Sequence, residues 1–201
     1  MSGMVTVSRE TQQRLDAFMQ LLRHWSQTIN LVSKADLAGK LQERHIADSL
    51  ALVPHLPSQG NNLVDIGSGG GLPAIPIAIA TGRCVHLVEA DHRKSAFLET
   101  ALATLGIKGA VWADRIETTL APPAGCVTAR ALAPLPVLLG YAHRLLLPGG
   151  TALFLKGEQV EAEIVAARMS WRMDVVILPG SMPRTRILKV SSLEPIYDAL
   201  R

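Results

Sequence analysis

The first part of the chain follows a helical pattern of apolar and polar positions. From Ser8 onward, apolar residues recur at spacings of three and four, which is typical of an amphipathic helix. The series consists of Leu15, Phe18, Met19, Leu22, Trp25 and Ile29. The Ser8 hydroxyl can accept a hydrogen bond from the first free backbone amides, so we expect Ser8 to cap this helix.

A second helical stretch is predicted over residues 36–53. Pro54 stops it, because proline lacks the amide hydrogen that a helix interior needs. Residues 57–62 are polar and rich in turn formers, so they are expected to form a loop. We therefore place an N-terminal helical extension at residues 1–60 and the main domain at residues 61–201.

Beyond this loop, short apolar runs alternate with helical runs. Such alternation, with strands that are apolar on both faces, is typical of a parallel sheet covered by helices on both sides. The predicted strands cover residues 63–66, 85–89, 110–113, 126–130 and 151–155, and the predicted helices cover residues 72–81, 94–105, 135–146 and 158–169. The sequence thus predicts an α/β fold with a doubly wound sheet.

The last two predicted strands break this alternation. Residues 173–178 and 186–191 are strand-like, and the turn region between them at 179–183 is too short to hold a crossover helix. The two strands must therefore pair antiparallel. A terminal antiparallel hairpin on a mainly parallel sheet resembles the seven-stranded class I S-adenosylmethionine-dependent methyltransferase fold, whereas a dinucleotide-binding sheet would continue with parallel strands.

The composition fits one domain with an extension. The chain has 201 residues, 48% of them hydrophobic and 18% charged, which is enough for one sizeable core. Cys84 and Cys126 are too few for a disulfide framework or a zinc cluster, so we expect a reducing cytoplasm and no metal site. No apolar run reaches the ~18 residues of a membrane span, and the amino terminus lacks the apolar core of a signal peptide, so we expect a soluble protein.

The charge is mildly basic and unevenly distributed. A net charge of +3 permits a polyanionic partner without requiring one. Between positions 168 and 189 there is one acid, Asp174, and there are five basic residues: Arg168, Arg172, Arg184, Arg186 and Lys189. This segment is either a solvated surface or a surface that contacts RNA, and its composition leaves both open.

A glycine-rich turn follows the first predicted strand of the main domain. Gly67, Gly69 and Gly71 form a GxGxG pattern, in which backbone amides can approach a ligand with no side chain in the way. A nicotinamide site would need a small residue at the sixth position, which is Leu72 here. A phosphate-binding loop would need a Gly-Lys-Ser or Gly-Lys-Thr ending, which does not follow.

Two carboxylates at strand ends suit S-adenosylmethionine. Asp65 ends the first strand and could meet the sulfonium or amino acid tail, directly or through water. Glu89 ends the second strand, where a carboxylate can accept from both ribose hydroxyls. Asp91 is the rival for this role, two residues further on. Together with Gly67 and Gly69, these acids predict a methyltransferase cofactor site.

The sequence around the fourth strand narrows the reaction. Residues 128–134 contain neither the asparagine nor the aromatic residue typical of exocyclic amine methylation. Cytosine C5 methylation needs a nucleophilic cysteine, and Cys126 lies in an apolar run where a thiol is usually inert packing. Guanine N7 has a free lone pair in the neutral base, so its methylation needs positioning and no general base.

Five blocks of sequence point to one family. They lie at residues 30–33, 43–50, 65–73, 129–135 and 155–157. With these blocks the chain resembles, over nearly its whole length, the bacterial 16S ribosomal RNA guanine-N7 methyltransferase family, also known as glucose-inhibited division protein B. The second and fourth blocks are not shared by methyltransferases generally, so the resemblance is specific to this family.

The resemblance implies S-adenosylmethionine as cofactor and 16S ribosomal RNA, or the small ribosomal subunit, as partner of a monomeric enzyme. It implies that Gly67 and Leu72 line the cofactor turn and that Ile116 and Glu117 border the adenine. It also implies that Arg130 reaches the site from the fourth strand as a catalytic residue. Arg130 could hold the cofactor carboxylate or an RNA phosphate, and a structural ion pair is its alternative.

Other candidates for substrate contact could instead have structural roles. His45 and Asp48 share one helix face, so they either form a local pair that fixes the extension or contact the substrate. Lys156 ends the fifth strand and either contacts phosphate or caps the strand. Phosphate contacts are also expected of three bases in the last strand region, Arg184, Arg186 and Lys189.

Two other functions remain open from the sequence. A small-molecule methyltransferase would use the N-terminal helices as a lid that is apolar inside. A non-catalytic RNA-binding module would keep the cofactor pocket as a relic. An RNA enzyme should instead show a basic band that joins the last strand region to the mouth of the cofactor site.

Overall fold

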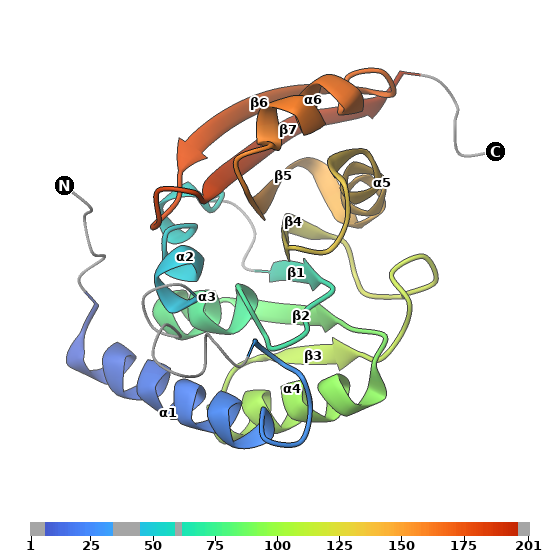
Figure 1. The fold of residues 1–201 in the computed structure, drawn as a ribbon. Coiled ribbons are helices and arrows are strands. Elements are labelled where there is room, and N and C mark those ends of the chain that lie inside the picture. Colours follow the sequence, from blue (N-terminus) through green and yellow to red (C-terminus); the bar gives the residue numbers. More distant parts are fainter. Residues whose placement is uncertain (1–6, 34–44, 59–61, 197–201) are drawn as a thin grey trace.

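The computed structural model describes residues 7–33, 45–58 and 62–196, and these contain a seven-stranded sheet. Its strands are β1 (Asn62–Ile66), β2 (Cys84–Val88), β3 (Gly109–Trp112), β4 (Ala124–Arg130), β5 (Leu146–Lys156), β6 (Trp171–Pro179) and β7 (Arg186–Pro195). Their order is β3-β2-β1-β4-β5-β7-β6, and Figure 1 shows them stacked from β3 at the bottom to β6 and β7 at the top. Only β7 runs antiparallel to its neighbours, β5 and β6. The predicted class I methyltransferase fold is confirmed.

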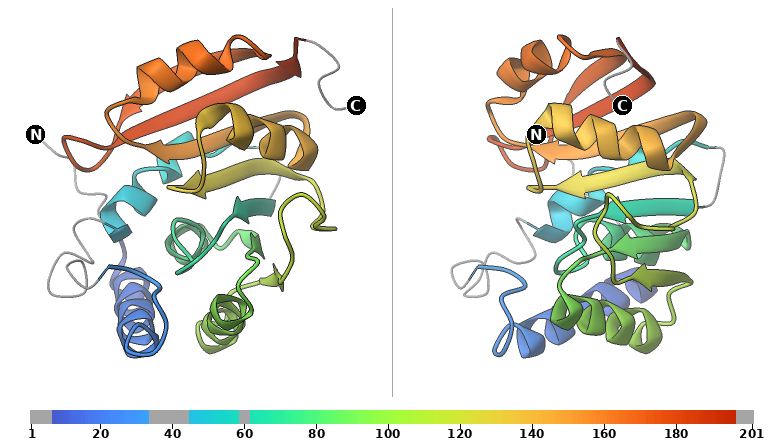
Figure 2. Two further views of the ribbon diagram at one scale, coloured as in Figure 1. Left: turned by 45° about the vertical axis from the view of Figure 1, so that its right-hand side comes forward. Right: turned by 90° about the vertical axis from the view of Figure 1, so that its right-hand side faces the viewer.

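Helices cover both faces of the sheet, which explains why its inner strands are apolar on both sides (Figure 2). Leu63 of β1 belongs to one core, and its neighbours Val64 and Ile66 belong to the other. The first core packs under α1 (Arg9–Trp25), α2 (Ala47–Leu50), α3 (Ala74–Thr81) and α4 (His92–Thr104), with the 3-10 turn η2 (Val53–His55) beside them. The second packs under α5 (Leu135–Leu145) and α6 (Val160–Ala167).

The N-terminal helix is closely packed on the main domain. Ser8 caps α1 as predicted, since its hydroxyl accepts from the Thr11 amide at 3.1 Å. A Cβ atom added at Gly70 would lie 3.2 Å from both Leu22 Cδ1 and the Leu31 carbonyl oxygen. Helix α1 and the residues that follow it therefore close one side of the glycine turn after β1. Residues on both sides of position 60 share one core. The division into an extension and a domain at that position stays a prediction.

Most elements lie within a few residues of their predicted bounds, and two regions need comment. Residues 34–44, in the predicted helix over 36–53, lie outside the described residues, and the described part holds α2 and η2, with Pro54 inside η2. Strand β5 starts at Leu146, the last residue of the predicted helix over 135–146, and includes residues 147–150 ahead of the predicted strand over 151–155. Leu146 pairs with Ala124 of β4 across a register shift, so strand pairing outweighs the local turn signal. No helix in the described ranges is long and apolar enough to cross a membrane.

Candidate functional site

The glycine turn after β1 depends on backbone conformations that favour glycine. Gly67, Gly69 and Gly71 have φ angles of +65°, +51° and +75°. The Gly67 amide donates to the Val88 carbonyl at 2.9 Å, which holds the turn against the end of β2. A Cβ atom at Gly67 would lie 2.5 Å from Leu132 Cδ1, whereas one at Gly69 would meet nothing closer than 3.8 Å. Leu132 therefore packs against Gly67, while the backbone at Gly69 is open at the carboxyl edge of the sheet.

A hollow of about 920 Å³, including space open to solvent, lies over this turn, and we call it the glycine-turn hollow. It lies at the carboxyl ends of parallel strands, where open α/β sheets bind ligands. Six of the eight predicted cofactor residues line it. The lining residues are Gly67, Gly69, Val88, Glu89, Ala90, Lys94, Arg115, Ile116, Glu117, Arg130, Ala131, Leu132, Ala133 and Tyr141.

Glu89 both lines the hollow and braces the turn. Its Oε2 accepts from the Gly69 amide at 2.8 Å, and its Oε1 accepts from the Asp91 amide at 2.9 Å. Asp91, the rival, caps α4 instead: its Oδ1 accepts from the Arg93 amide at 2.8 Å and from the Lys94 amide at 3.3 Å. These hydrogen bonds hold the pKa of Asp91 below its usual value. Asp91 does not line the hollow, so the geometry favours Glu89 as the ribose acceptor.

Two predicted cofactor residues lie beneath the turn and do not line the hollow. Asp65 is 1% exposed, and its Oδ1 accepts from the Thr128 hydroxyl at 2.6 Å. Burial raises the pKa of Asp65 to about 7, and the Thr128 hydrogen bond opposes this rise. Leu72 is 8% exposed and belongs to the core under α3. Both residues therefore pack beneath the turn and support it.

The side of the hollow expected to take the adenine contains a residue that sequence reasoning missed. Ile116 and Glu117 line the hollow as predicted, and so does Tyr141 of α5. The Tyr141 hydroxyl donates to Glu117 Oε1 at 2.6 Å, which lowers the pKa of Glu117. Arg144, one helical turn on, donates to the Glu117 carbonyl. Helix α5 thus holds the loop after β3 through Tyr141 and Arg144. No spacing in the sequence indicates these contacts.

Arg130 and Ala131 line a second hollow as well, of about 770 Å³ including space open to solvent. We call it the Lys156 hollow. Ala131 has a φ of +46°, so the chain bends sharply where β4 ends and its backbone lies between the two hollows. The Lys156 hollow is lined by Asp48, Arg130, Ala131, Leu155, Lys156, Gly157, Glu163 and Thr185.

Lys156 is held in an ion pair. Its Nζ lies 2.6 Å from Glu163 Oε2 and donates to the Ala133 carbonyl at 3.2 Å. Glu163 Oε2 also accepts from the Leu135 amide at 2.8 Å. The pair therefore joins β5, α6 and the start of α5. The predicted contact of Lys156 with phosphate stays a prediction, and the structure adds Glu163 beside it.

Asp48 connects distant parts of the chain. Its Oδ1 accepts from the Ser181 amide at 3.2 Å and from the Ser181 hydroxyl, and its Oδ2 accepts from the Thr185 hydroxyl at 3.3 Å. Asp48 is 3% exposed and lines the Lys156 hollow. His45, 5% exposed, lines neither hollow. The helix face expected to carry either a local pair or a substrate contact ties α2 to the turn between β6 and β7 through Asp48.

The three bases predicted to form one band are divided. Arg184 is paired with the exposed Glu158 at 2.9 Å, and Arg186 donates to the Pro183 carbonyl at 2.7 Å. Alternate residues of a strand point to the same face, so Lys189 shares a face with Ile187, which packs in the core under α1 to α4. Arg186 is one residue from Ile187 and points to the other face. Arg186 and Lys189 therefore lie on opposite faces of β7. All three RNA contacts stay predictions.

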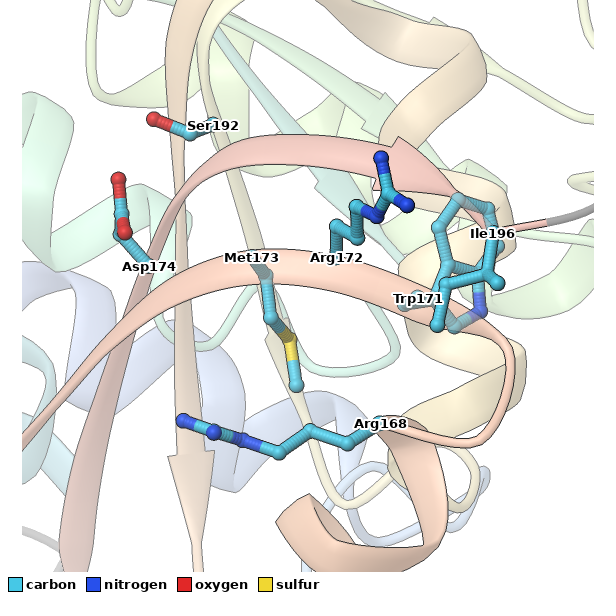
Figure 3. Close-up of a pocket in the computed structure, with 7 residues that line it drawn as sticks. All are labelled: Arg168, Trp171, Arg172, Met173, Asp174, Ser192 and Ile196. Carbon is cyan, nitrogen blue, oxygen red and sulfur yellow. The ribbon is translucent and has the colours of Figure 1, made fainter.

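A third hollow, of about 810 Å³ including space open to solvent, lies beside the first residues of β6. Because β6 runs parallel to β5, this hollow is at the opposite edge of the sheet from the glycine turn. Figure 3 shows Met173 pointing toward Arg168 and away from Arg172 and Asp174. Two of the five basic residues in the segment from 168 to 189 are thus remote from the predicted cofactor site.

The described residues show no sign of thiol or metal chemistry. Burial raises the pKa of Cys126 to about 12, so its thiol is inert packing. No group of three or more histidine, cysteine or acidic side chains in the described ranges could hold a metal ion.

The glycine-turn hollow fits S-adenosylmethionine. Gly67 and Gly69 line the hollow without side chains, Glu89 presents a carboxylate at the end of β2, and Ile116 supplies an apolar wall. A backbone cradle with one strand-end acid is the donor set that a nucleoside with a free ribose diol requires.

Comparisons with known proteins agree with this geometry. A family model described as rRNA small subunit methyltransferase G matches residues 11–183. The ribosomal RNA small subunit methyltransferase G of Granulibacter bethesdensis is 48% identical, over 94% of this chain and 89% of that protein. Its counterpart in Gluconobacter oxydans is 47% identical, over 96% of this chain and 100% of that protein.

Solved structures share the fold at low identity. An O-methyltransferase from Streptomyces achromogenes, solved in complex with S-adenosylmethionine, has a TM-score of 0.57 at 14% identity, over 93% of this chain and 92% of that one. The family, the methyltransferase activity and the cofactor S-adenosylmethionine, all expected from the sequence, are confirmed. The chain belongs to the rRNA small subunit methyltransferase G family.

Proposed function

We propose that this methyltransferase transfers a methyl group to N7 of one guanine in 16S ribosomal RNA, as a monomer in the cytoplasm, where ribosomal RNA is found. The observation behind the proposal is the shared wall of the two hollows. Arg130 and Ala131 line both, so a nucleoside over the glycine turn and a base in the Lys156 hollow would be direct neighbours. Holding two reactants side by side provides most of the catalysis in such a reaction.

The residues over the glycine turn would hold the cofactor. When bound, S-adenosylmethionine supplies a methyl group on a positively charged sulfur. The backbone of Gly67 and Gly69 allows close approach, Glu89 would accept from the ribose hydroxyls, and Ile116 would contact the adenine. Arg130 has a planar fork of donors suited to a carboxylate or a phosphate at the junction of the hollows.

Guanine N7 needs no proton removed before it reacts. Its lone pair forms the new bond to the methyl carbon while the carbon–sulfur bond breaks, and the positive charge passes from sulfur to the base. The chain therefore needs neither a general base nor a nucleophile for this step. This agrees with an inert Cys126 thiol and with an Asp65 carboxyl that is buried beneath the turn.

The test uses small ribosomal subunits from cells that lack the gene. We expect the purified protein to place a labelled methyl group on one guanine, detected by chain cleavage specific for N7-methylguanine. Arg130→Ala should lower turnover roughly 100-fold while the melting temperature stays unchanged, because mispositioned reactants lose about that factor. The matched control is Arg172→Ala at the opposite sheet edge, with parental turnover expected. Methylation of another atom, or no methylation, would contradict the proposal.

A further inference from the structure

The Lys156 hollow has the position and size of a site for the base that receives the methyl group. It meets the glycine-turn hollow at Arg130 and Ala131, and its cavity volume without the open solvent space, about 340 Å³, is within the ~300–1,000 Å³ typical of ligand pockets. A guanine that turns N7 toward this shared wall has its N1–H and N2–H groups on the far side. That edge consists of donors, so the deep part of the hollow must supply acceptors.

Two acids line the hollow, and they differ in what already neutralises them. Glu163 is paired with Lys156 at 2.6 Å. Asp48, by contrast, has only neutral partners among the described residues, namely the Ser181 amide and hydroxyl and the Thr185 hydroxyl. Its Oδ1 takes both Ser181 donors, while its Oδ2 takes one donor from Thr185, another residue of the wall. A carboxylate oxygen has two lone pairs, so Oδ2 can accept one more donor.

The reaction itself favours a carboxylate at this position. The base is neutral before methyl transfer and positively charged afterwards, so its N1–H and N2–H groups become stronger donors as the new bond forms. A buried negative charge beside them stabilises the transition state more than the ground state. A neutral acceptor would bind the base but would gain little from the new charge.

We infer that the Lys156 hollow is the pocket for the target guanine and that Asp48 accepts from its Watson–Crick edge, an inference that rests on the proposed function. The N-terminal segment then supplies part of the base site, because Asp48 belongs to α2. Its tie to the turn between β6 and β7 holds the carboxylate in place, and the paired Lys156 and Glu163 line the same hollow.

The test compares guanine with inosine, which lacks the N2 amino group. RNA is assembled with either base at the methylated position once that position has been mapped, and kcat/KM is measured for both. We expect the parent protein to prefer guanine by about 10- to 100-fold, the value of a hydrogen bond to a charged acceptor.

Asp48→Asn should remove this preference. Ser181 donates twice to Oδ1, so the amide oxygen of the variant would stay there and its NH2 group would face the base, donor against donor. We expect kcat/KM on guanine to fall by about 10- to 100-fold and the guanine-to-inosine ratio to approach one. Glu158→Gln, the same change at an exposed acid outside both hollows, should keep the parental ratio.

A fold check and a second variant keep the test decisive. If Asp48→Asn melts early, Thr185→Val removes the hydroxyl on Oδ2 but keeps the tie to Ser181, and it should lower the ratio to a smaller extent. An unchanged ratio in folded Asp48→Asn, with N7 methylation intact, would overturn this assignment alone. A parent protein that methylates neither RNA at N7 would overturn the proposed function and this assignment with it.

Discussion

The two hollows on either side of Arg130 have different kinds of wall. The glycine-turn hollow has one side made of consecutive backbone, where the left-handed Gly67 and Gly69 are braced by Glu89, while charged side chains such as Lys94 and Arg115 line its other parts. The Lys156 hollow is walled by charged side chains from four separate segments, α2, β4, β5 and α6. One of its ties, from Asp48 to Ser181, joins residues 133 positions apart.

This difference has a physical consequence. A cradle of backbone is set by a few φ angles and by what surrounds them, so single substitutions with a side chain should destroy it. A wall of paired charges depends on partners from several elements, so removing one partner should alter its chemistry and leave the fold. The predictions below test this contrast between loss of space and loss of charge.

The largest effect is expected at Gly67. Gly67→Val forces a β-branched residue to a φ of +65° and would place its Cβ 2.5 Å from Leu132 Cδ1, so we expect no measurable binding of S-adenosylmethionine by calorimetry. Gly82→Val is the matched control, because Gly82 has a φ of +71° and open space around it. It should lower the melting temperature and keep the affinity. Equal loss of binding in both variants would point to general destabilisation instead.

Asp65 should make stability depend on pH. Its pKa is about 7 in the folded protein against 3.8 for an ordinary carboxyl, so the folded state holds the proton more tightly between these values. The contribution of the protonated group is therefore complete below about pH 4 and is lost as the pH rises through 7. Relative to Asp65→Asn, the parent should lose roughly 4 kcal/mol of unfolding free energy over this range.

Denaturant unfolding of both proteins between pH 4 and pH 8 measures the difference. The variant keeps an oxygen for the Thr128 hydroxyl, so its fold is preserved. We expect the gap between variant and parent to widen up to about pH 7 and then to level off. A constant gap, or one that narrows with rising pH, is incompatible with a raised pKa at Asp65.

Glu89→Ala should have a smaller effect on the cofactor hollow than Gly67→Val. The ribose would lose a charged acceptor, and the Gly69 amide would lose its partner, so we expect affinity for S-adenosylmethionine to weaken by roughly 1–3 kcal/mol. Asp91→Ala removes the cap of α4 and should lower stability while it keeps the affinity. A weaker affinity in Asp91→Ala, with Glu89→Ala unaffected, would move the ribose contact to Asp91.

The contrast between the hollows also decides what the sequence can predict. Gly67 and Glu89 could be placed because each follows directly from a strand end, and parallel strand ends meet at one edge, whereas Ile116 was expected from the family resemblance. Tyr141 and Glu163 could not, because each comes from the middle of a helix and reaches the site through packing. Asp65 and Leu72 follow the same local pattern as Gly67, but the sequence does not show that they face the core.

Asp48 shows the same limit on a larger scale. Its helical spacing to His45 predicted either a local pair or a substrate contact, and gave no sign of its partners Ser181 and Thr185. They lie in a turn whose position depends on the order of β5, β7 and β6. The strand parity of Arg186 and Lys189 was readable from the sequence, since residues three apart on a strand point to opposite faces. The expectation of one basic band overlooked it.

The smallest effect is expected from the bases around the last strand, which should position RNA without choosing the base. Each phosphate contact releases counterions, so its loss should lower the slope of log affinity against log salt by about 0.7–0.9. Arg184→Ala and Arg186→Ala should each show this change, since both residues lie beside the turn that holds Asp48, and Arg172→Ala at the opposite sheet edge should show none. A changed slope in Lys189→Ala alone would place the RNA on the α1 to α4 face. Parental slopes in Arg184→Ala, Arg186→Ala and Lys189→Ala would mean that RNA binds elsewhere on the molecule.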